Sequence, residues 1–462
     1  MNIDDVIDEA LKIYKPSKEE EDHLLMIADK IIRGVEEEAS RYRGILKISL
    51  EGSLAKGTWI RGREEVDIFV HFDPRKPREE MEDEIIELGF KVLKNLDGEP
   101  RLMYADHPYV ESRINNIIVN IVACYSTEPS KWISATDRTP YHTRYILEKM
   151  DENLRDDVRL MKAFMVGCKI YGAEIKIRGF SGYLTELLTL NYRGFKNSLE
   201  AISRWKPPII IDIERNFTSV EEVSSLFPKQ PLIVIDPVDK FRNVASAVSE
   251  EKLYELILAS KLFLRSPSLK FFTVEEHHPK SSILKKMVKN RSFIALFFKL
   301  SKWKPPDILW GEIKKSERGI RRALEKNGVK VYRSASWTDE EKKCLIILEL
   351  ESNMLPSLEV HEGPPVDHPN SLEFLDKWKN RKDKIAGPWI HGSRLYILRL
   401  RKITEVKKIL RREIDGDRVA LAKGLAEDIK KGRIFTSIER LVRYDQLSTF
   451  IYEFLNAHPP YL

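Results

Sequence analysis

Residues Gly52–Phe72 read GSLAKGTWIRGREEVDIFVHF, and this stretch decides the fold of the first part of the chain. It joins a Gly-Ser turn to a strand that carries two acidic residues. Gly52 permits a tight turn, and Ser53 stands at the start of a short helix whose N–H groups attract phosphate oxygens. Lys56 adds a positive charge one turn later. The turn therefore suits a phosphorylated ligand.

The two acids of this stretch indicate phosphoryl transfer. Glu65 and Asp67 are two positions apart on a strand, so both project from one face and can share divalent metal ions. In a two-metal site, one ion activates a hydroxyl and the other neutralises a triphosphate and the leaving pyrophosphate. Taken alone, two such acids are more often a solvent-facing strand edge. The Gly-Ser turn upstream favours the functional interpretation.

The residues around this stretch predict an α+β domain. Ser17 and Glu20 form a capping-box pattern, which predicts a helix from there to about Arg41. Alternating and β-branched runs predict strands at Ile45–Gly52, Val66–Phe72 and Asn116–Tyr125.

The rest of the chain predicts helices first and a mixed region afterwards. Apolar residues recur at three and four positions from Leu154 to about Arg204, so this segment should be mainly helical. We expect a second pair of helices after Asp236. Beyond Lys330, the runs KVYRSASW and CLIILELE predict an antiparallel hairpin, and SRLYILRL at Ser393–Leu400 predicts another strand.

Composition limits the class of protein. The chain has 462 residues, of which 42% are hydrophobic and 32% charged, so a disordered or collagen-like chain is excluded. Its three scattered cysteines exclude a disulfide framework and a zinc ribbon, and they favour the cytoplasm. The acidic start is unlike a signal peptide, and no apolar run is long enough to span a bilayer. We therefore expect a folded cytoplasmic protein with no membrane partner.

The distribution of charge points to nucleic acid. The net charge is only +6, from 78 basic and 72 acidic residues. However, Lys280–Lys304 and Arg394–Arg412 combine dense Lys and Arg with aromatic residues, a pattern that suits a phosphate backbone.

These motifs together resemble the class I, archaeal-type CCA-adding enzymes, which are tRNA nucleotidyltransferases of the polymerase-beta-like superfamily. The Gly-Ser turn and the Glu-x-Asp pair are the signature of the superfamily. Narrower family motifs follow in order along most of the chain: TW (58–59), YADHPYV (104–110), DRTPYH (137–142), RLMKAF (159–164), IYGAEIKIRGFSGYLTELL (170–188), DPVDKFRNVASA (236–247) and HEGPPVDHPNSLEFL (361–375).

The resemblance implies template-independent addition and repair of the 3′-terminal CCA of tRNA, from CTP and ATP, with Mg²⁺ and release of pyrophosphate. Family members are also implicated in tRNA surveillance by tandem CCA addition, and they commonly form homodimers. We expect an α+β nucleotidyltransferase head with a mixed sheet at 1–149. A helical central domain that completes the nucleotide site should follow at 150–266, and a mixed α/β tRNA-binding body and tail at 267–462.

Matched by position, the resemblance makes Glu65 and Asp67 the metal ligands. Arg242 matches an arginine that reads the incoming base together with tRNA phosphates. The residues that the resemblance assigns to the nucleotide are Ser53, Lys56, His142, Lys162 and Tyr171. Without the resemblance, His142 would more often be a turn residue. Lys162 would more often be a solvated lysine, and Tyr171 a packing residue at a helix end.

Two positions depart from the family pattern. Lys56 stands where arginine is common, so a single ammonium replaces a bidentate fork. Asn120 stands where the family has a third carboxylate. Its carbonyl oxygen can coordinate a metal ion, but it carries no charge and cannot accept a proton from a hydroxyl. Asp106 and Glu111 are near in sequence, but we expect them in the turn before the strand.

The asparagine leaves four interpretations open: a tolerated variation, a deliberate inactivating substitution, a misplaced match or a naturally inactive protein. Two alternative functions follow. One is a catalytically weakened or silent tRNA-binding relative. The other is a different terminal nucleotidyltransferase such as a poly(A) polymerase, which the DRTPYH and HEGPPV segments argue against.

Overall fold

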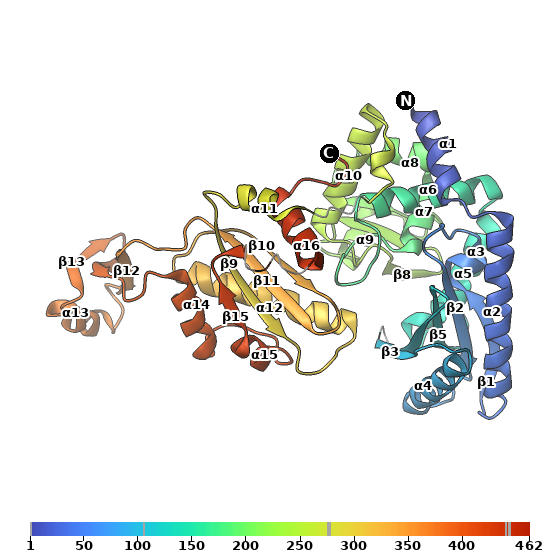
Figure 1. Cartoon of the computed structure of the whole chain (residues 1–462), viewed down its shortest axis with the longest axis horizontal. Helices are drawn as coiled ribbons and strands as arrows, with labels where there is room; N and C mark the ends of the chain where they lie inside the picture. The colour runs from blue at the N-terminus through green and yellow to red at the C-terminus, as the bar shows by residue number, and fades with distance from the viewer. Residues whose placement is uncertain (1, 105–106, 275–278, 439–440, 442–444) are drawn as a thin grey trace. The chain divides into compact units, whose positions relative to one another are not determined.

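The structure is a computed structural model that describes residues 2–104, 107–274, 279–438, 441 and 445–462. The chain divides into two compact units. The first comprises Met1–Glu275 together with His458–Leu462, and the second comprises Glu276–Ala457. Figure 1 shows the course of the chain through both units.

The first unit starts with a five-stranded mixed sheet in the order β1-β2-β5-β4-β3, in which β2 and β5 are parallel and the other neighbours are antiparallel. Side chains of α2 and α4 pack on one face of this sheet and form a core with alternate residues of β2 and β5. The elements are α1 (Ile3–Tyr14), α2 (Lys18–Ala39), β1 (Ile45–Glu51), α3 (Gly52–Lys56), β2 (Glu65–Phe72), α4 (Arg78–Asn95), β3 (Arg101–Tyr104), β4 (Pro108–Ile114) and β5 (Ile117–Tyr125).

Local sequence patterns account for the start of this domain. Ser17 Oγ accepts a hydrogen bond from the Glu20 N–H (3.2 Å), and the Ser17 N–H donates to Glu20 Oε2 (2.6 Å). This capping box begins α2 as expected. The three expected strands are present as β1, β2 and β5, which confirms the α+β prediction for the head.

The other face of the sheet carries a row of polar residues. Asp67 in β2 pairs with Glu51 in β1 and with Asn120 in β5, and Asn120 pairs with Glu111 in β4. Residues that pair directly across neighbouring strands point to the same face. The row therefore crosses four strands.

The position of Glu111 corrects an expectation. It lies within β4 and not in a turn. The turn between β4 and β5 falls instead at Asn115 and Asn116, whose φ angles are 48° and 69°. Asparagine tolerates this left-handed conformation, and two such residues form the tight turn that joins antiparallel strands.

Helices dominate the rest of the first unit, which confirms the helical prediction for the segment that begins at Leu154. Their core includes a cluster of aromatic rings in which Phe164, Phe195 and Phe263 have centroids 5.5 to 5.9 Å apart. The helices and 3₁₀ turns are η1 (Ala135–Arg138), α5 (Thr139–Lys149), α6 (Glu152–Gly167), α7 (Gly182–Tyr192), α8 (Phe195–Ile202), α9 (Val220–Leu226), α10 (Glu250–Arg265) and η2 (Leu269–Phe271).

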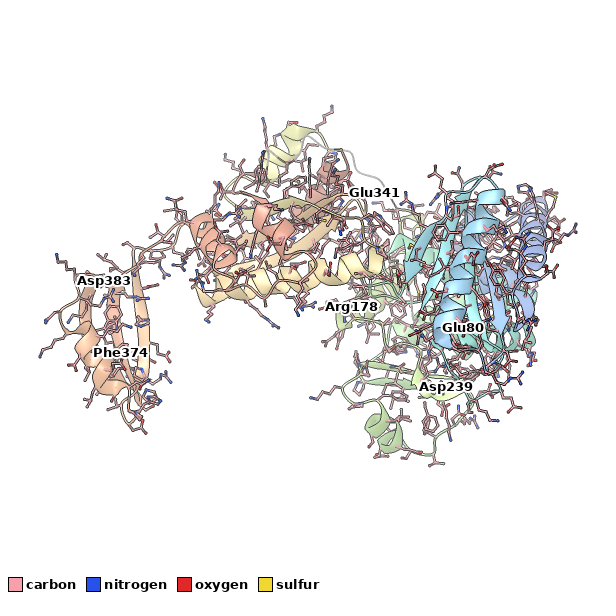
Figure 2. All side chains as sticks on the ribbon, turned by 90° about the horizontal axis from the view of Figure 1, so that it is seen from below. Glu80, Arg178, Asp239, Glu341, Phe374 and Asp383 are labelled. Atoms are coloured by element: carbon pink, nitrogen blue, oxygen red, sulfur yellow. The ribbon has the colours of Figure 1, made fainter. Side chains whose placement is uncertain are left out.

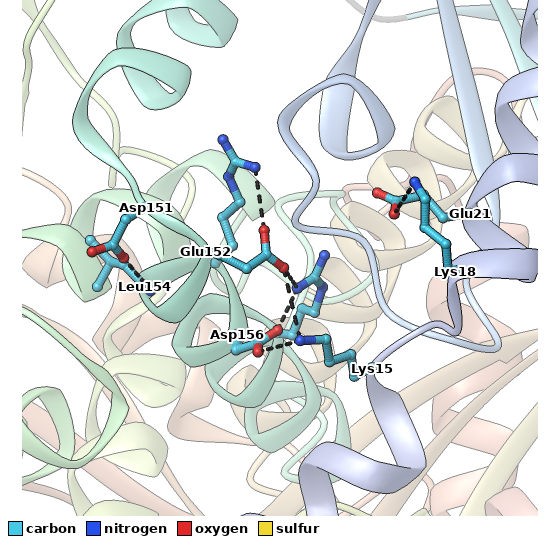
Figure 3. A network of polar contacts seen from close by, with 9 residues as sticks. Lys15, Lys18, Glu21, Asp151, Glu152, Leu154 and Asp156 are labelled. Atoms are coloured by element: carbon cyan, nitrogen blue, oxygen red, sulfur yellow. Dashed lines mark hydrogen bonds and ion pairs between the residues drawn. The ribbon is translucent and has the colours of Figure 1, made fainter.

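Polar contacts fix the start of α6, as Figure 3 shows. Asp151 caps this helix by accepting a hydrogen bond from the Leu154 N–H (2.9 Å). Lys15, which follows α1, donates to Asp156 Oδ2 on α6 (2.6 Å). The N-terminal helix is therefore tied to the helix that carries Lys162.

The expected pair of helices after Asp236 is confirmed only in part. Asp236 ends a strand of a small sheet in the order β6-β7-β8, and the helix α10 and the single 3₁₀ turn η2 follow that sheet. Asp236 ends β7, and its Oδ1 accepts a hydrogen bond from the Val238 N–H (3.1 Å), which forms the turn into β8. The strands are β6 (Ile209–Ile211), β7 (Leu232–Asp236) and β8 (Asp239–Asn243). Figure 2 marks Asp239 at the start of β8.

The second unit contains a four-stranded antiparallel sheet in the order β10-β11-β9-β15, buried on both faces. Helices α12, α14 and α15 pack on one face, and α11 and α16 pack on the other. The expected hairpin is confirmed as β10 and β11. The elements are α11 (Ser281–Met287), β9 (Ser292–Lys299), α12 (Pro306–Lys326), β10 (Val331–Thr338), β11 (Lys343–Leu350), α14 (Val406–Asp415), α15 (Ala426–Lys431), β15 (Arg433–Phe435) and α16 (Asp445–Asn456).

A smaller three-stranded sheet in the order β12-β14-β13 lies within the same unit. Phe374 and Trp378 of α13 pack on Leu395 and Ile397 of β14. Figure 2 labels Phe374 on this helix. The predicted strand at Ser393–Leu400 is confirmed as β14. The elements are β12 (Leu358–Pro365), α13 (Ser371–Lys379), β13 (Lys384–His391) and β14 (Arg394–Leu400).

After α16 the chain returns to the first unit. The ring of Tyr461 stacks on Phe271, with the centroids 4.7 Å apart, and joins the core of the helical part. In the described residues, no helix combines the length and apolarity that crossing a membrane requires.

Candidate functional site

The two acids of β2 meet the asparagine of β5. Asn120 Nδ2 donates to Glu65 Oε1 (2.7 Å) and to Asp67 Oδ1 (2.9 Å). Burial raises the pKa of the Glu65 carboxyl. Burial, together with the charge of Glu65, raises the pKa of Asp67 to about 7. The site therefore holds two carboxylates that lack enough compensating positive charge.

The glycine of the Gly-Ser turn lies against one of these acids. Gly52 has a φ of 72°, a conformation that side chains disfavour. A Cβ at this position would also overlap the Asp67 carboxylate. Only glycine lets the turn approach the acid this closely.

Two polar atoms of the same row lack a protein partner in the described part of the chain. Asn120 is only 7% exposed, and its carbonyl Oδ1 accepts no hydrogen bond. Glu51 is buried and accepts from Ser49 Oγ through Oε1 (2.6 Å), but its Oε2 is also without a partner. Buried oxygens without donors are costly unless a ligand completes them.

The oxygens around Glu65 and Asp67 can be compared with what a divalent cation requires. The donors are oxygens, which hard cations such as Mg²⁺ prefer. A cation would oppose the burial and the like charge that raise the two carboxyl pKa values, and the free carbonyl oxygen of Asn120 would be a further neutral ligand if the amide turned toward it. The residues present therefore fit the divalent metal that the resemblance implies, and Glu65 and Asp67 stay its predicted anionic ligands.

Two lysines meet a buried acid beside the carboxylates. Lys56 of α3 donates to Glu186 Oε2 (2.6 Å), and Lys162 of α6 donates to Glu186 Oε1 (3.0 Å). Thr58 Oγ1 also donates to Glu186 Oε1 (2.6 Å). Although burial alone would raise the pKa of Glu186, the charges of the two lysines outweigh it and lower the pKa to about 2. One carboxylate thus faces two ammonium groups, which leaves a net positive charge.

Tyr171 and Ser53 lie next to this group. A Cβ on Gly182 would lie 2.9 Å from Tyr171 Oη and 3.7 Å from Lys162 Nζ, so both side chains converge on the start of α7. Burial, followed by the charge of Glu186, raises the pKa of Tyr171. Ser53 lies in α3, three residues before Lys56.

A second polar group surrounds Asp236, which is fully buried. Its Oδ2 contacts His142 Nε2 (2.9 Å) and accepts from Arg242 Nη1 (2.7 Å), and its Oδ1 accepts from Tyr183 Oη (3.2 Å). Burial lowers the pKa of His142 despite the acid beside it, and the contact with the carboxylate is one in which the histidine Nε2–H donates. The side chain of Arg242 is 37% exposed, so its guanidinium keeps a side open to a ligand.

Aromatic contacts join the two groups. The ring of Tyr183 stacks on His142 with centroids 3.9 Å apart, and Lys56 Nζ lies 5.8 Å from the centre of the same tyrosine ring. The structure thus gathers the predicted residues of both groups in the first unit. Asp106 lies outside the described residues.

The sequence analysis missed the residues that hold the predicted ones in place, namely Glu186, Asp236, Tyr183 and Thr58. One signal was present in the sequence. Glu186 stands among the leucines of GYLTELL, which predicts that it is buried, and a buried acid needs a paired cation. The partner could not be deduced, because Lys56 lies 130 positions earlier.

Comparison with known proteins identifies the family. Residues 29–142 match the nucleotidyltransferase domain, residues 156–273 the second domain of tRNA nucleotidyltransferase, and residues 289–437 the C-terminal domain of the CCA-adding enzyme. A curated CCA-adding enzyme of Pyrobaculum islandicum is 35% identical over 410 residues, which cover 88% of this chain and 93% of the relative. This chain belongs to the CCA-adding enzyme family.

Other archaeal family members agree. The CCA-adding enzyme of Saccharolobus shibatae is 35% identical over 88% of this chain and 91% of its own length. That of Thermoplasma acidophilum is 35% identical over 88% of this chain and 89% of its own length. The predicted resemblance to archaeal-type tRNA nucleotidyltransferases is confirmed. The expected domain boundaries at 149 and 266 and the roles of the individual site residues stay predictions.

The contact at Gly52 leads to a first prediction. Gly52→Ala should lower nucleotide addition by on the order of a hundredfold or more, because the new Cβ displaces the Asp67 carboxylate. The backbone strain should cost only about 1–2 kcal/mol of the free energy of unfolding. Single-turnover addition and urea denaturation measure the two effects.

Gly62→Ala is the matched control. Gly62 also has a positive φ, 84°, but a Cβ there meets no atom within 4 Å. This variant should show a similar loss of stability and nearly full activity. Equal loss of activity in both variants would mean that strain, and not the contact with Asp67, is responsible.

Proposed function

We propose that this family member adds and repairs the 3′-terminal CCA of tRNA without a nucleic-acid template, using CTP and ATP and releasing pyrophosphate. The observation that carries the proposal is the convergence of two carboxylates and two lysines beside the Gly-Ser turn. Carboxylates that hold metal ions and cations that bind a triphosphate are the parts that nucleotidyl transfer needs.

Glu65 and Asp67 would hold the two metal ions, which we take to be Mg²⁺, with Asn120 Oδ1 as a weaker, uncharged third ligand. Such ions lower the pKa of the attacking tRNA 3′-hydroxyl and neutralise the triphosphate and the leaving pyrophosphate. The protein itself positions the reactants. Because Asn120 has no negative charge, this position holds a cation less firmly than a carboxylate would.

Lys56 and Lys162 bind the triphosphate, together with Ser53 at the turn. In the free protein the two lysines are held by Glu186, which orients both ammonium groups before substrate arrives. One acid does not neutralise two lysines, so attraction for an anion remains. Tyr171, beside Lys162, binds on the sugar side of the nucleotide.

His142 helps to hold the nucleotide, and Arg242 forms the base side of the site. Asp236 fixes both, so the histidine contacts the nucleotide and the guanidinium fork faces a base edge with restricted freedom. Arg242 reads the incoming base together with tRNA phosphates. The Watson–Crick edges of cytosine and adenine both present an exocyclic amino group beside an unprotonated ring nitrogen, whereas uracil and guanine present a carbonyl oxygen beside a ring N–H.

The second unit binds the acceptor stem of tRNA by its shape and backbone, since a CCA enzyme must accept every tRNA. Several cations of the two basic segments are already paired, as Arg291 is with Glu349 and Lys304 is with Glu312. Exposed lysines such as Lys299 are therefore better candidates for phosphate contacts. We also propose that the protein acts in the cytoplasm, takes part in tRNA surveillance by tandem CCA addition, and forms a homodimer.

The central experiment incubates the protein with tRNA that lacks its 3′ end, separately with CTP, ATP, UTP and GTP. Ordered incorporation of C and then A supports the proposal. A run of A residues alone would indicate a poly(A) polymerase, and tRNA binding without incorporation would indicate a silent relative. Product lengths on sequencing gels distinguish the three outcomes.

Asp67→Ala should lower the rate of adding both C and A by on the order of a hundredfold or more, because one anionic metal ligand is lost. The affinity for tRNA should change little, since the metal ions serve transfer and not RNA binding. Filter binding and single-turnover assays measure both. Retention of most activity would contradict the assignment of the metal ligands.

Arg242→Ala should reduce the preference for C and A over U and G by about tenfold, which is the discrimination that one bidentate contact provides. The control is Lys240→Ala, which removes an exposed charge two positions earlier on the same strand, β8. Addition from each nucleotide triphosphate measures the preference. A uniform fall in rate with unchanged preference would assign Arg242 to phosphate binding.

The tRNA affinity should fall linearly with salt on a log–log plot. Replacing Lys299, Lys302 and Lys402 together by Gln should reduce the slope by roughly one for each phosphate that is no longer neutralised. The same change at three exposed lysines of the first unit, Lys12, Lys18 and Lys30, should leave the slope unchanged. An affinity that does not respond to salt would contradict a phosphate-binding role for the second unit.

A further inference from the structure

The amide of Asn120 presents the wrong end to a cation. Its Nδ2 donates to both Glu65 and Asp67, whereas its Oδ1 is buried without a partner in the described residues. An amide N–H cannot coordinate a metal ion, and only the carbonyl oxygen can. As it stands, the side chain occupies the acids and offers no ligand.

A half-turn of the amide would correct this. Rotation about the Cβ–Cγ bond exchanges the two ends, so Oδ1 would face the space that Glu65 and Asp67 share. The two N–H groups of Nδ2 would then move to the buried position that Oδ1 leaves. Donors in that position need an acceptor, since a buried unpaired N–H is unfavourable.

Glu111 is placed to be this acceptor. It pairs directly with Asn120 across the antiparallel strands β4 and β5, whereas Asp67 pairs with Asn120 from the opposite side. Directly paired residues share a face and have Cβ atoms about 4.5–5.5 Å apart. Tyr109, two positions before Glu111, packs with Phe69 of β2 on this same face.

The charge of Glu111 is also felt at the site. Burial is the main cause of the raised pKa of Glu65, and Glu111 contributes to it as a like charge. Glu51 is the other acid of the row, but it pairs with Asp67 from β1, on the far side from Asn120. Of the two, Glu111 alone can reach the amide.

We propose that Glu111 and Asn120 together replace a single carboxylate at the metal site. Glu111 accepts a hydrogen bond from Asn120 Nδ2 and so holds Oδ1 toward the cation. It also places a negative charge, which Arg113 and Arg101 partly offset, one residue further out than the asparagine. Glu111 is thus a positioning residue, and the inference rests on the metal site proposed above.

The test measures Mn²⁺ binding to the full chain, by electron paramagnetic resonance of free Mn²⁺, without tRNA or nucleotide. Glu111→Leu, which removes both the acceptor and the charge, should weaken binding by about tenfold or more, the usual effect of losing a group that orients a metal ligand. Glu111→Gln, which loses the charge but keeps an acceptor oxygen, should weaken it less. Asn120→Asp should strengthen binding and raise the single-turnover rate at limiting Mg²⁺, each by at least about tenfold.

The double variant decides the question. With Asp at position 120, the site has its own carboxylate and no amide to orient, so Glu111→Leu should then cause a much smaller loss of Mn²⁺ affinity than it does in the parent protein. A purely structural role would produce the same loss in both backgrounds. Equal losses, or no loss in the parent protein, would overturn the proposal.

Two controls complete the design. Glu99→Gln removes an exposed acid from the same surface hollow that Glu111 lines, and it should leave Mn²⁺ affinity unchanged. Asp67→Ala should abolish binding. If Asp67→Ala kept its affinity, the proposed metal site itself would be wrong, an outcome that is distinct from failure of Glu111 alone. Thermal unfolding checks that every variant is folded.

Discussion

Two carboxylates held side by side and partly withdrawn from water repel each other, and the surroundings of the site depend on this constraint. Glu65 and Asp67 are placed together by the two-residue period of β2. Their charge is met on one side by the N–H groups of Asn120 and at longer range by Lys162 and Lys56. Burial, together with the charge of Glu65, still raises the pKa of Asp67, and a cation bound here as proposed would relieve the remaining repulsion.

The two lysines are held together in the same way, with the signs of the charges reversed. Glu186 withdraws one negative charge from water to hold two positive ones, from α3 and from α6. A buried acid with a pKa of about 2 stays ionised throughout the physiological range, so it orients the ammonium groups at every pH at which the protein works. The cations are thereby prepared for an anion before one arrives, which reduces the reorganisation that binding requires.

The sequence predicts those parts of the fold and site that depend on neighbouring residues. The capping box of Ser17 and the Glu65-x-Asp67 spacing are local patterns, and both were sufficient. Partners that come together only in the folded chain could not be deduced. Glu186, for example, pairs with Lys56, which lies 130 positions earlier. The short strand β8 stands where a helix was expected after Asp236, because five residues carry too little periodicity to reveal a strand. The basic segments predicted more unpaired positive charge than the structure has, because ion pairs such as Arg291–Glu349 neutralise part of it.

The return of Tyr461 to the aromatic core of the first unit has a topological consequence. The chain enters the second unit once and leaves it again, so Glu276–Ala457 is an insertion within the first unit and not an appendage at one end. A single cleavage between the units would leave them covalently joined. Removing the last five residues would take away the ring that stacks on Phe271. The helical core that carries Lys162, beside the proposed nucleotide site, would lose packing although the change lies far away in the sequence.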